Sequence, residues 1–216
     1  MITEKVTVND NPVVLQNLTR IRDKNTGSQD VRTAIRQITR FLLYEAAKNL
    51  PLVQKEVATP LAKFKTQTID PDINIIISPI LRAGLIFTDE AADILPQACI
   101  RHIGMYRDEK TLTPVWYYNK VPAITSNPEK HYVYITDPML ATGNSLVGAV
   151  KLYAENEVPL SNIRVICLIA APEGIENLHG RYPEVEIFTA ALDKGLDENG
   201  YILPGMGDAG DRIFNT

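Results

Sequence analysis

Short apolar runs alternate with helical stretches along most of the chain. The runs have the length and β-branched content of buried strands, and they cover Ile73–Ile77, Ile100–Tyr106, Tyr132–Thr136, Arg164–Ala170 and Val185–Ala190. Stretches with apolar residues at helical spacing lie between them, at Leu85–Ile94, Ser145–Asn156 and Glu173–His179. This alternation predicts an α/β fold, in which helices flank both faces of a mainly parallel sheet.

The segment before these runs, residues 10–50, is mostly helical by the same criterion. Apolar residues recur at i, i+3/i+4 and i+7 between Val31 and Ala47, and Pro51 ends the pattern. A polar strand pair or loop is expected to follow, through Pro60 and Pro71. Since no internal repeat interrupts the chain, we expect residues 1–216 to form one domain.

Two segments depart from the alternating pattern. Arg107–Lys130 is polar, contains three prolines and is too long for a tight turn, so we expect an extended hairpin or arm over the end of the sheet. Its aromatic residues Trp116, Tyr117 and Tyr118 fit either the core or a dimer contact. The tail Leu196–Thr216 is rich in Gly and Asp, and irregular segments of that length within a compact domain are often functional.

Composition and charge narrow the classes of function. The net charge of −4 and the lack of a Lys/Arg stripe argue against nucleic-acid binding, although a local basic pocket for a small anion remains compatible with them. Cys99 and Cys167 lie in apolar runs and form no metal or disulfide pattern. No apolar run approaches the roughly 18 residues of a membrane span, and the N-terminus lacks a signal-peptide pattern, so we expect a cytosolic protein.

The segment Asp137–Ser145 has the features of a phosphate-binding loop. It follows a predicted buried strand and leads into a predicted helix, whose first amide groups lack intrahelical partners and attract anions. Gly143 allows the backbone to approach a ligand closely, and the hydroxyls of Thr142 and Ser145 are suitable donors to a phosphate. The carboxylate of Asp137 is suited to accept hydrogen bonds from the hydroxyls of a ribose.

Taken alone, Thr142–Ser145 is also compatible with an ordinary helix cap. The loop is not a Walker A motif, because no Gly-Lys-Ser/Thr follows, and it lacks the three spaced glycines of a dinucleotide-binding fingerprint. Other segments of the chain are needed to decide between a cap and a ligand site.

Those segments indicate a family. The run Val133–Ser145, with Asp-Pro-Met-Leu-Ala-Thr-Gly at its centre, resembles the phosphoribosyl-pyrophosphate (PRPP) motif of type I phosphoribosyltransferases, and in particular of their uracil branch. Pro79–Gly84 is similar to the family's pyrophosphate loop, and Ile103–Arg107 to the strand that carries a second PRPP arginine. Gly200–Arg212 is similar to its uracil-binding tail, which implies a C-terminal hood that binds the base. The resemblance extends from about Arg20 to Thr216, with the motifs in the family's order.

The chain departs from the family pattern at Asn144, where a second glycine is usual. Asparagine tolerates left-handed backbone angles better than most residues, so we expect the loop to form nevertheless. Most type I enzymes also have two consecutive acidic residues here, whereas this chain has Thr136 followed by Asp137. The single acid agrees with the uracil branch rather than the purine branch.

The resemblance implies a site in three parts. Arg82 and Arg107 would hold the pyrophosphate, Asp208 would reach the PRPP site through Mg²⁺ and water, and Ile202, Gly207, Asp208 and Ala209 would bind uracil. The ribose 5-phosphate would lie on Asp137, Pro138, Met139, Leu140, Ala141, Thr142, Gly143, Asn144 and Ser145. The implied cofactor is Mg²⁺, carried mainly by PRPP and water rather than by a protein cage. A homodimer or dimer-based assembly is also implied; some relatives respond to GTP, and no pattern in these residues indicates whether this chain does.

Each of these residues also has a simpler interpretation. Arg82 is compatible with a surface arginine after a strand, Arg107 with a local ion pair to Asp108 or Glu109, and Asp208 with a turn in a Gly-rich loop. No residue stands out as an obligate base for uracil.

Two other functions compete with uracil transfer. The first is a phosphoribosyltransferase for a purine or orotate, against which the tail Tyr201–Asp211 argues because those branches lack an obvious counterpart. The second is a regulator that binds UMP or RNA without catalysis, and the acidic balance of the chain argues against its RNA-binding form.

Overall fold

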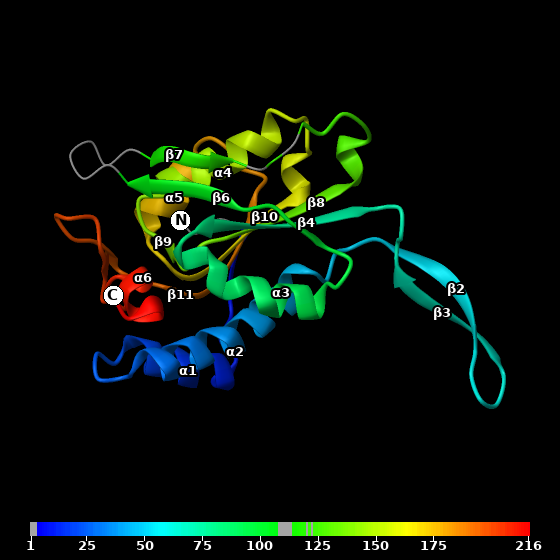
Figure 1. Ribbon diagram of the computed structural model, residues 1–216, viewed down its shortest axis with the longest axis horizontal. Coiled ribbons are helices and arrows are strands. Elements are labelled where there is room, and N and C mark those ends of the chain that lie inside the picture. The colour runs from blue at the N-terminus through cyan, green and yellow to red at the C-terminus, as the bar shows by residue number, and fades with distance from the viewer. Residues whose placement is uncertain (1–3, 108–113, 120, 122) are drawn as a thin grey trace.

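The computed structural model describes residues 4–107, 114–119, 121 and 123–216, and a nine-stranded sheet lies at its centre (Figure 1). The strands run in the order β1-β11-β10-β8-β4-β6-β7, with β5 beside β4 and β9 beside β10. Their bounds are β1 Val6–Val8, β4 Asn74–Leu81, β5 Cys99–Ile100, β6 Ile103–Arg107, β7 Pro114–Asn119, β8 His131–Thr136, β9 Met139–Leu140, β10 Ile163–Ala170 and β11 Glu186–Leu192. All pairings described within this sheet are parallel except β6 with β7, which confirms the predicted mainly parallel sheet.

Helices cover both faces of the sheet, as the alternation predicted. The helices on one face are α1 (Pro12–Arg22), α2 (Ser28–Ala46), α3 (Thr88–Ile94) and α6 (Ala209–Phe214), and those on the other are α4 (Asn144–Ala154) and α5 (Pro172–His179) (Figure 1). Single 3-10 turns occupy η1 (Ala83–Phe87), η2 (Pro128–Lys130) and η3 (Leu160–Asn162). The helical N-terminal region and the two helices after β8 and β10 are confirmed, whereas the predicted helix Leu85–Ile94 consists of the end of η1 followed by α3.

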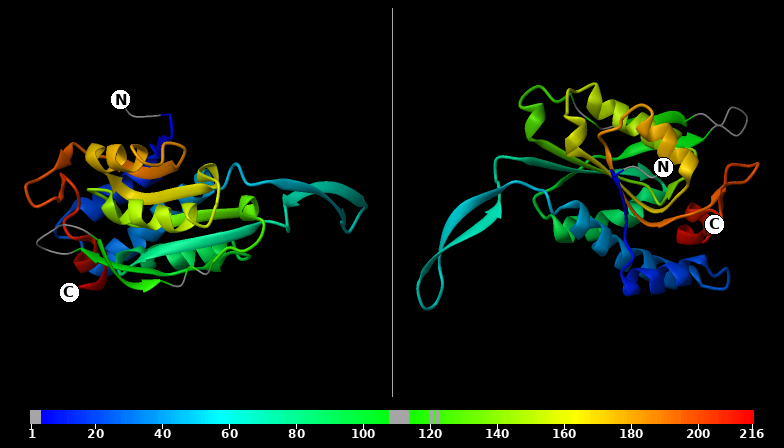
Figure 2. Two further views of the ribbon diagram at one scale, coloured as in Figure 1. Left: turned by 90° about the horizontal axis from the view of Figure 1, so that it is seen from above. Right: turned by 180° about the vertical axis from the view of Figure 1, so that it is seen from behind.

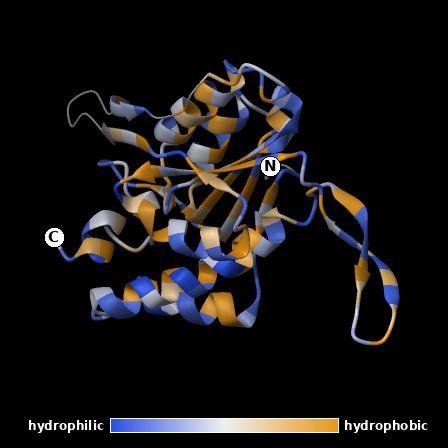
Figure 3. Cartoon of the chain, turned by 45° about the vertical axis from the view of Figure 1, so that its right-hand side comes forward, coloured by the Kyte–Doolittle hydropathy of each residue, from blue (hydrophilic) through white to orange (hydrophobic). Residues whose placement is uncertain are grey.

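The core consists of two apolar clusters, one on each side of the sheet. Successive strand residues point to opposite faces, so Ile75 and Ile77 join the cluster under α2 while Ile76 joins the one under α4. All residues of β10 are buried, because it lies between β8 and β11 with helices on both faces. The hydropathy view shows these apolar strands between the helical layers (Figure 3).

The sheet differs from the sequence prediction in two places. The run Ile100–Tyr106 was expected to be one strand, but it is two, β5 and β6, interrupted at Arg101 and His102. At the break, Ser78 Oγ donates to the carbonyl of Arg101 at 2.9 Å, so a side chain interrupts the regular ladder. The edge strand β1 was not predicted, because three residues carry too little of a period-two pattern to be recognised.

Two antiparallel hairpins extend the fold. Strands β2 (Leu52–Ala58) and β3 (Lys63–Ile69) pair along their whole length and project from the body in all three views (Figures 1 and 2). Of the predicted hairpin or arm Arg107–Lys130, the structure describes strand β7, which pairs antiparallel with β6, a strand that lies almost wholly before the predicted segment. Residues 108–113, 120 and 122 lie outside the described part.

The chain after β11 folds into a small cap at one end of the sheet. It contains the two-stranded ribbon of β12 (Gly195–Leu196) and β13 (Ile202–Leu203), followed by α6. We call residues 193–214 the hood. The predicted C-terminal hood is therefore present, and it lies beside the loops that follow β4 and β8.

Candidate active site

Three segments predicted to bind ligand meet at the carboxyl edge of the sheet. The loop after β4 begins at Arg82, the loop after β8 begins at Asp137, and the hood follows β11. The parallel register aligns Pro79 with Thr136, so the first two loops leave the sheet side by side. Ligands of open α/β sheets bind at this edge.

The loop after β8 forms the predicted turn into a helix. Gly143 caps α4 with a φ of 79°, and a Cβ at that position would lie 2.7 Å from the carbonyl oxygen of Gly174. Only glycine fits this close approach to α5 without strain. The main chain around Gly143 borders a cavity of about 110 Å³, lined by Asp137, Met139 and 141–146.

Asn144 has a different role from the one considered in the sequence. The φ angle of Asn144 is not positive, so its tolerance of left-handed backbone angles is not needed. The left-handed residue of this loop is Gly143. The side-chain oxygen of Asn144 instead accepts a hydrogen bond from Asn177 Nδ2 at 2.9 Å, and the same amide donates to the carbonyl of Thr142 at 2.8 Å. Asn177 on α5 therefore links two residues of the loop.

Asp137 lies at the floor of the site. Its side chain is partly exposed to the cavity, but protein surrounds the carboxyl group, and this desolvation raises its pKa to about 7. The backbone amide of Met139 donates to Oδ1 over 3.5 Å, which offsets the shift only slightly. A carboxyl group held in this way is harder to ionise than that of a surface aspartate.

A second cavity, of about 300 Å³, joins the three segments. Arg82, Asp137, Ser145 and Asp208 line it, with Ile80, Leu81, Ala83, Met105, Met139, Ala209 and Gly210. It shares Asp137 and Ser145 with the cavity at the loop. The guanidinium of Arg82 lies 5.8 Å from the ring centre of Phe214, so a residue of the hood supports this arginine.

A third cavity, of about 140 Å³, lies under the hood. Its lining comprises Met139, Ala141, Gly200, Tyr201, Ile202, Gly207, Asp208 and Ala209. All four residues that the resemblance assigned to uracil are therefore gathered here. Tyr201 was not singled out by the sequence, although an aromatic residue directly before Ile202 is a recognisable indication of a site for a flat ring.

Asp208 belongs to both larger cavities and also caps a helix. Its Oδ1 accepts the backbone N–H of Asp211 at 2.9 Å, at the start of α6. The turn interpretation and the ligand interpretation of Asp208 are thus compatible, since one oxygen caps the helix while the residue lines the cavities.

Arg107 ends β6 beside Pro114, and the position of its side chain lies outside the described part of the structure. Within the described residues, no three His, Cys, Asp or Glu side chains gather as a metal site. Asp137 and Asp208 are the carboxylates that line the central cavity.

Comparison with known proteins decides the family. The family model of uracil phosphoribosyltransferase matches residues 8–216. The chain belongs to the uracil phosphoribosyltransferase family. The uracil phosphoribosyltransferase of Dictyoglomus thermophilum is 47% identical over 98% of this chain and 99% of its own, and that of Clostridium tetani is 44% identical over the same shares.

Solved structures agree with the fold of this family. The AQ2163 protein of Aquifex aeolicus is 32% identical, covers 97% of both chains and superposes with a TM-score of 0.87. The adenine phosphoribosyltransferase of Trypanosoma brucei, in complex with AMP, pyrophosphate and ribose-5-phosphate, is 16% identical, with a TM-score of 0.56 over 92% of this chain and 88% of its own. The latter supports the type I phosphoribosyltransferase fold alone. Among the described residues, no helix is long and apolar enough to cross a membrane.

The raised pKa of Asp137 leads to a prediction about stability. An aspartate in the unfolded chain has a pKa of about 3.9, so ionisation of Asp137 above that pH opposes folding, increasingly up to its folded pKa of about 7. We expect Asp137→Asn to unfold a few degrees higher than the wild type at pH 8. This difference should shrink as the pH falls to 5 and vanish near pH 4. Thermal unfolding across this range checks it, and a difference independent of pH would contradict the shifted pKa.

Proposed function

We propose that this protein transfers the 5-phosphoribosyl group of PRPP to uracil and releases UMP and pyrophosphate. The observation that carries the proposal is the chain of three adjoining cavities at one edge of the sheet. The phosphate-loop cavity shares Asp137 and Ser145 with the central one, and the central one shares Asp208 and Ala209 with the hood cavity. This order corresponds to the 5-phosphate, the ribose with its pyrophosphate, and the base.

The loop 137–145 binds the ribose 5-phosphate in this proposal. The amides at the start of α4 and the hydroxyls of Thr142 and Ser145 donate to the phosphate oxygens. The carboxylate of Asp137 accepts hydrogen bonds from the ribose hydroxyls, which requires its ionised form. Its location at the floor shared by two cavities supports that assignment.

The leaving group is held by arginines. As the bond from the anomeric carbon to the pyrophosphate oxygen breaks, positive charge develops on the ribose and the departing oxygen keeps the electron pair. Arg82 and Arg107 donate to the pyrophosphate, because a guanidinium is always charged and pairs bidentately with phosphate oxygens. The position of Arg82 in the central cavity supports its role. Uracil N1 then bonds to the anomeric carbon and releases its proton.

The hood binds uracil through its main chain. Ile202, Gly207, Asp208 and Ala209 surround a small cavity in which backbone N–H and C=O groups read the edge of the base. Tyr201 lines the same cavity with an aromatic ring. Cytosine is excluded, because its amino group would leave buried polar groups of the hood without partners.

The carboxylates of the central cavity are compatible with Mg²⁺ that arrives on PRPP. Mg²⁺ keeps several waters and uses one or two protein carboxylates together with substrate phosphates, and Asp137 and Asp208 are the acids that this cavity offers. Asp208 would hold the ion through water. When bound, the ion neutralises charge on the pyrophosphate.

We further propose that residues 1–216 form one domain and that the protein is a homodimer. The β2–β3 hairpin supports a dimer, because an isolated two-stranded hairpin is only marginally stable in water and this one carries apolar side chains. Leu61 is 97% exposed and Phe64 58% exposed on it.

PRPP and UMP are highly charged and do not cross a bilayer unaided, so we place the reaction in the cytosol.

The activity is tested by offering uracil, cytosine, orotate, adenine and hypoxanthine separately with PRPP and Mg²⁺. We expect uracil to be converted to its nucleotide, UMP, faster than the other bases are converted to theirs. The rates are measured with and without GTP. Faster turnover of a purine or orotate would assign the protein to another base. Binding of UMP without its synthesis would support the regulator instead.

Asp208→Asn tests the proposed contact with the PRPP site. Asparagine still accepts the N–H of Asp211, so α6 remains capped. The lost charge should lower kcat at least about tenfold, a typical cost of removing one stabilising charge, with an unchanged thermal midpoint. Asp211→Asn, on the same helix but outside the cavities, serves as the control. A wild-type rate in Asp208→Asn would remove Asp208 from the mechanism.

The dimer is tested by placing a charge on the exposed hairpin. Leu61→Asp should convert a dimeric wild type to monomer in analytical ultracentrifugation, because burying an unpaired carboxylate in an interface is costly. Lys63→Gln on the same hairpin should leave the dimer intact. A monomeric wild type would contradict the dimer, and a dimeric Leu61→Asp would place the interface elsewhere.

A further inference from the structure

The main chain of the hood must be held in a fixed conformation if it is to recognise a base. Main-chain groups can read a base only if they are held within a fraction of an ångström, yet the segment from Ile202 to Ala209 includes two glycines with left-handed angles, Gly205 with φ 58° and Gly207 with φ 80°. Glycine loses more conformational freedom on folding than any other residue. The side chains of Ile202, Met206 and Ala209 anchor the segment in the apolar core, but the glycines between them have no side chain and need another support to keep one geometry.

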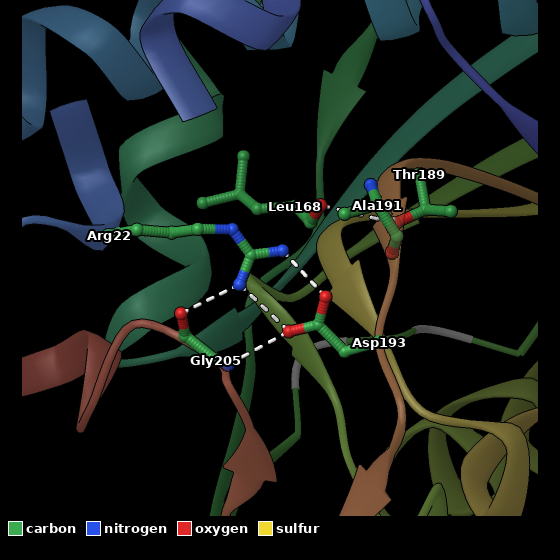
Figure 4. A network of polar contacts seen from close by, with 6 residues as sticks. All are labelled: Arg22, Leu168, Thr189, Ala191, Asp193 and Gly205. Carbon is green, nitrogen blue, oxygen red and sulfur yellow. Dashed lines mark hydrogen bonds and ion pairs between the residues drawn. The ribbon is translucent and has the colours of Figure 1, made fainter. Parts of the chain in front are cut away.

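For Gly205 this support is an ion pair that hydrogen-bonds both its N–H and its C=O group (Figure 4). Asp193 Oδ2 accepts the N–H of Gly205 at 2.8 Å, and Arg22 Nη1 donates to the carbonyl of Gly205 at 2.8 Å. The guanidinium and the carboxylate also pair bidentately, with Nη1–Oδ2 at 2.8 Å and Nη2–Oδ1 at 2.6 Å. We call these three residues the clamp.

Each charged partner of the clamp is attached to a rigid element. Arg22 is the last residue of α1, which packs on α2. Asp193 follows β11, and its amide donates to the carbonyl of Ala170 at 2.9 Å. Near the end of β11, the hydroxyl of Thr189 contacts the carbonyls of Leu168 and Ala191, as Figure 4 also shows.

Gly205 lies directly against a residue that lines the hood cavity. A Cβ on Gly205 would lie 2.2 Å from the carbonyl oxygen of Ile202, so the turn closes directly on a residue that lines that cavity. On the other side, Arg212 donates to the carbonyl of Met206 at 3.0 Å and to that of Asp23, next to Arg22, at 2.8 Å. A displacement of the clamp would therefore shift Ile202 and Gly207 together.

Stability alone is a weak explanation for this ion pair. The side chain of Asp193 is only 5% exposed and that of Arg22 24%. The free energy needed to desolvate both charges offsets much of their attraction. An apolar pair of similar volume therefore often stabilises a protein to the same extent. What an apolar pair lacks is the ability to hold a peptide N–H and a peptide C=O at set positions.

We infer that Arg22 and Asp193 are positioning residues that set the affinity and selectivity of the hood for uracil without touching the base. This inference rests on the proposed function, in which Ile202 and residues 207–209 read uracil. Arg22 also lies outside the three cavities, and its connection to the site is through Gly205.

The decisive variant is Arg22→Met combined with Asp193→Asn. Changing both avoids leaving one buried charge unpaired, and the asparagine oxygen still accepts the N–H of Gly205. We expect KM for uracil to rise about tenfold or more, because small misplacements of binding groups cost this much. KM for PRPP should change less than about threefold, and the preference for uracil over cytosine should fall.

Two further variants make the result specific. Arg22→Lys keeps the charge but loses the fork, so its KM for uracil should lie between those of the wild type and the double variant. Arg40→Met with Glu90→Gln removes a comparable ion pair between α2 and α3, whose acid is also largely buried. This control should leave KM for uracil unchanged. If the double variant does not fold, Arg22→Lys alone carries the test.

The outcomes separate the clamp from the function. An unchanged KM for uracil in both clamp variants, or equal rises for uracil and PRPP, would overturn the positioning role. A wild type that forms no UMP from uracil would instead overturn the proposed function. Hydrogen exchange of the amides at 203–208, faster in the double variant than in the Arg40/Glu90 control, gives a readout independent of turnover.

Discussion

The site depends on the parallel pairing of β8 with β4 on one side and β10 on the other. In a parallel sheet, the carboxyl ends of neighbouring strands lie at the same edge, so the loops after β4 and β8 are neighbours. Gly84 shows how close they are, since a Cβ there would lie 2.5 Å from the carbonyl oxygen of Thr136. The arginine of one loop and the aspartate of the other line one cavity because of this register.

The ionised carboxyl group of Asp137 opposes folding. Asp137 is surrounded by protein and has a raised pKa, and no cation forms an ion pair with it among the described residues. An aspartate on the surface would not lower the free energy of unfolding, but in the high dielectric of water it would interact only weakly with a ligand. Because the carboxyl group is desolvated, any hydrogen bond that it makes with a ligand is stronger, at the expense of stability in the free protein.

The hood depends on contacts with the rest of the chain for its conformation. Its apolar residues Ile202, Met206, Ala209 and Ile213 are buried in the core, but its glycines have no side chains with which to pack. Arginines of the first helical layer also hold its backbone, since Arg22 donates to the carbonyl of Gly205 and Arg32 to that of Ile213, both at 2.8 Å. In addition, Phe214 of the hood lies beside Arg82. This last contact connects the hood with the loop that follows β4, so the two segments that line the central cavity support each other.

The sequence by itself determined the α/β class, the main buried strands and the turn from strand to helix at 137–145, because each depends on a local pattern. A run such as Arg164–Ala170 is recognisable from its own apolar residues, and the loop 137–145 from its place between strand and helix. Only the tertiary structure decided the break in Ile100–Tyr106, the link from Asn177 to Asn144, and the clamp. Arg22 and Asp193 stand 171 positions apart, and a contact of two single residues across that distance leaves no periodicity in the chain. It arises only when folding places the end of α1 against the end of β11.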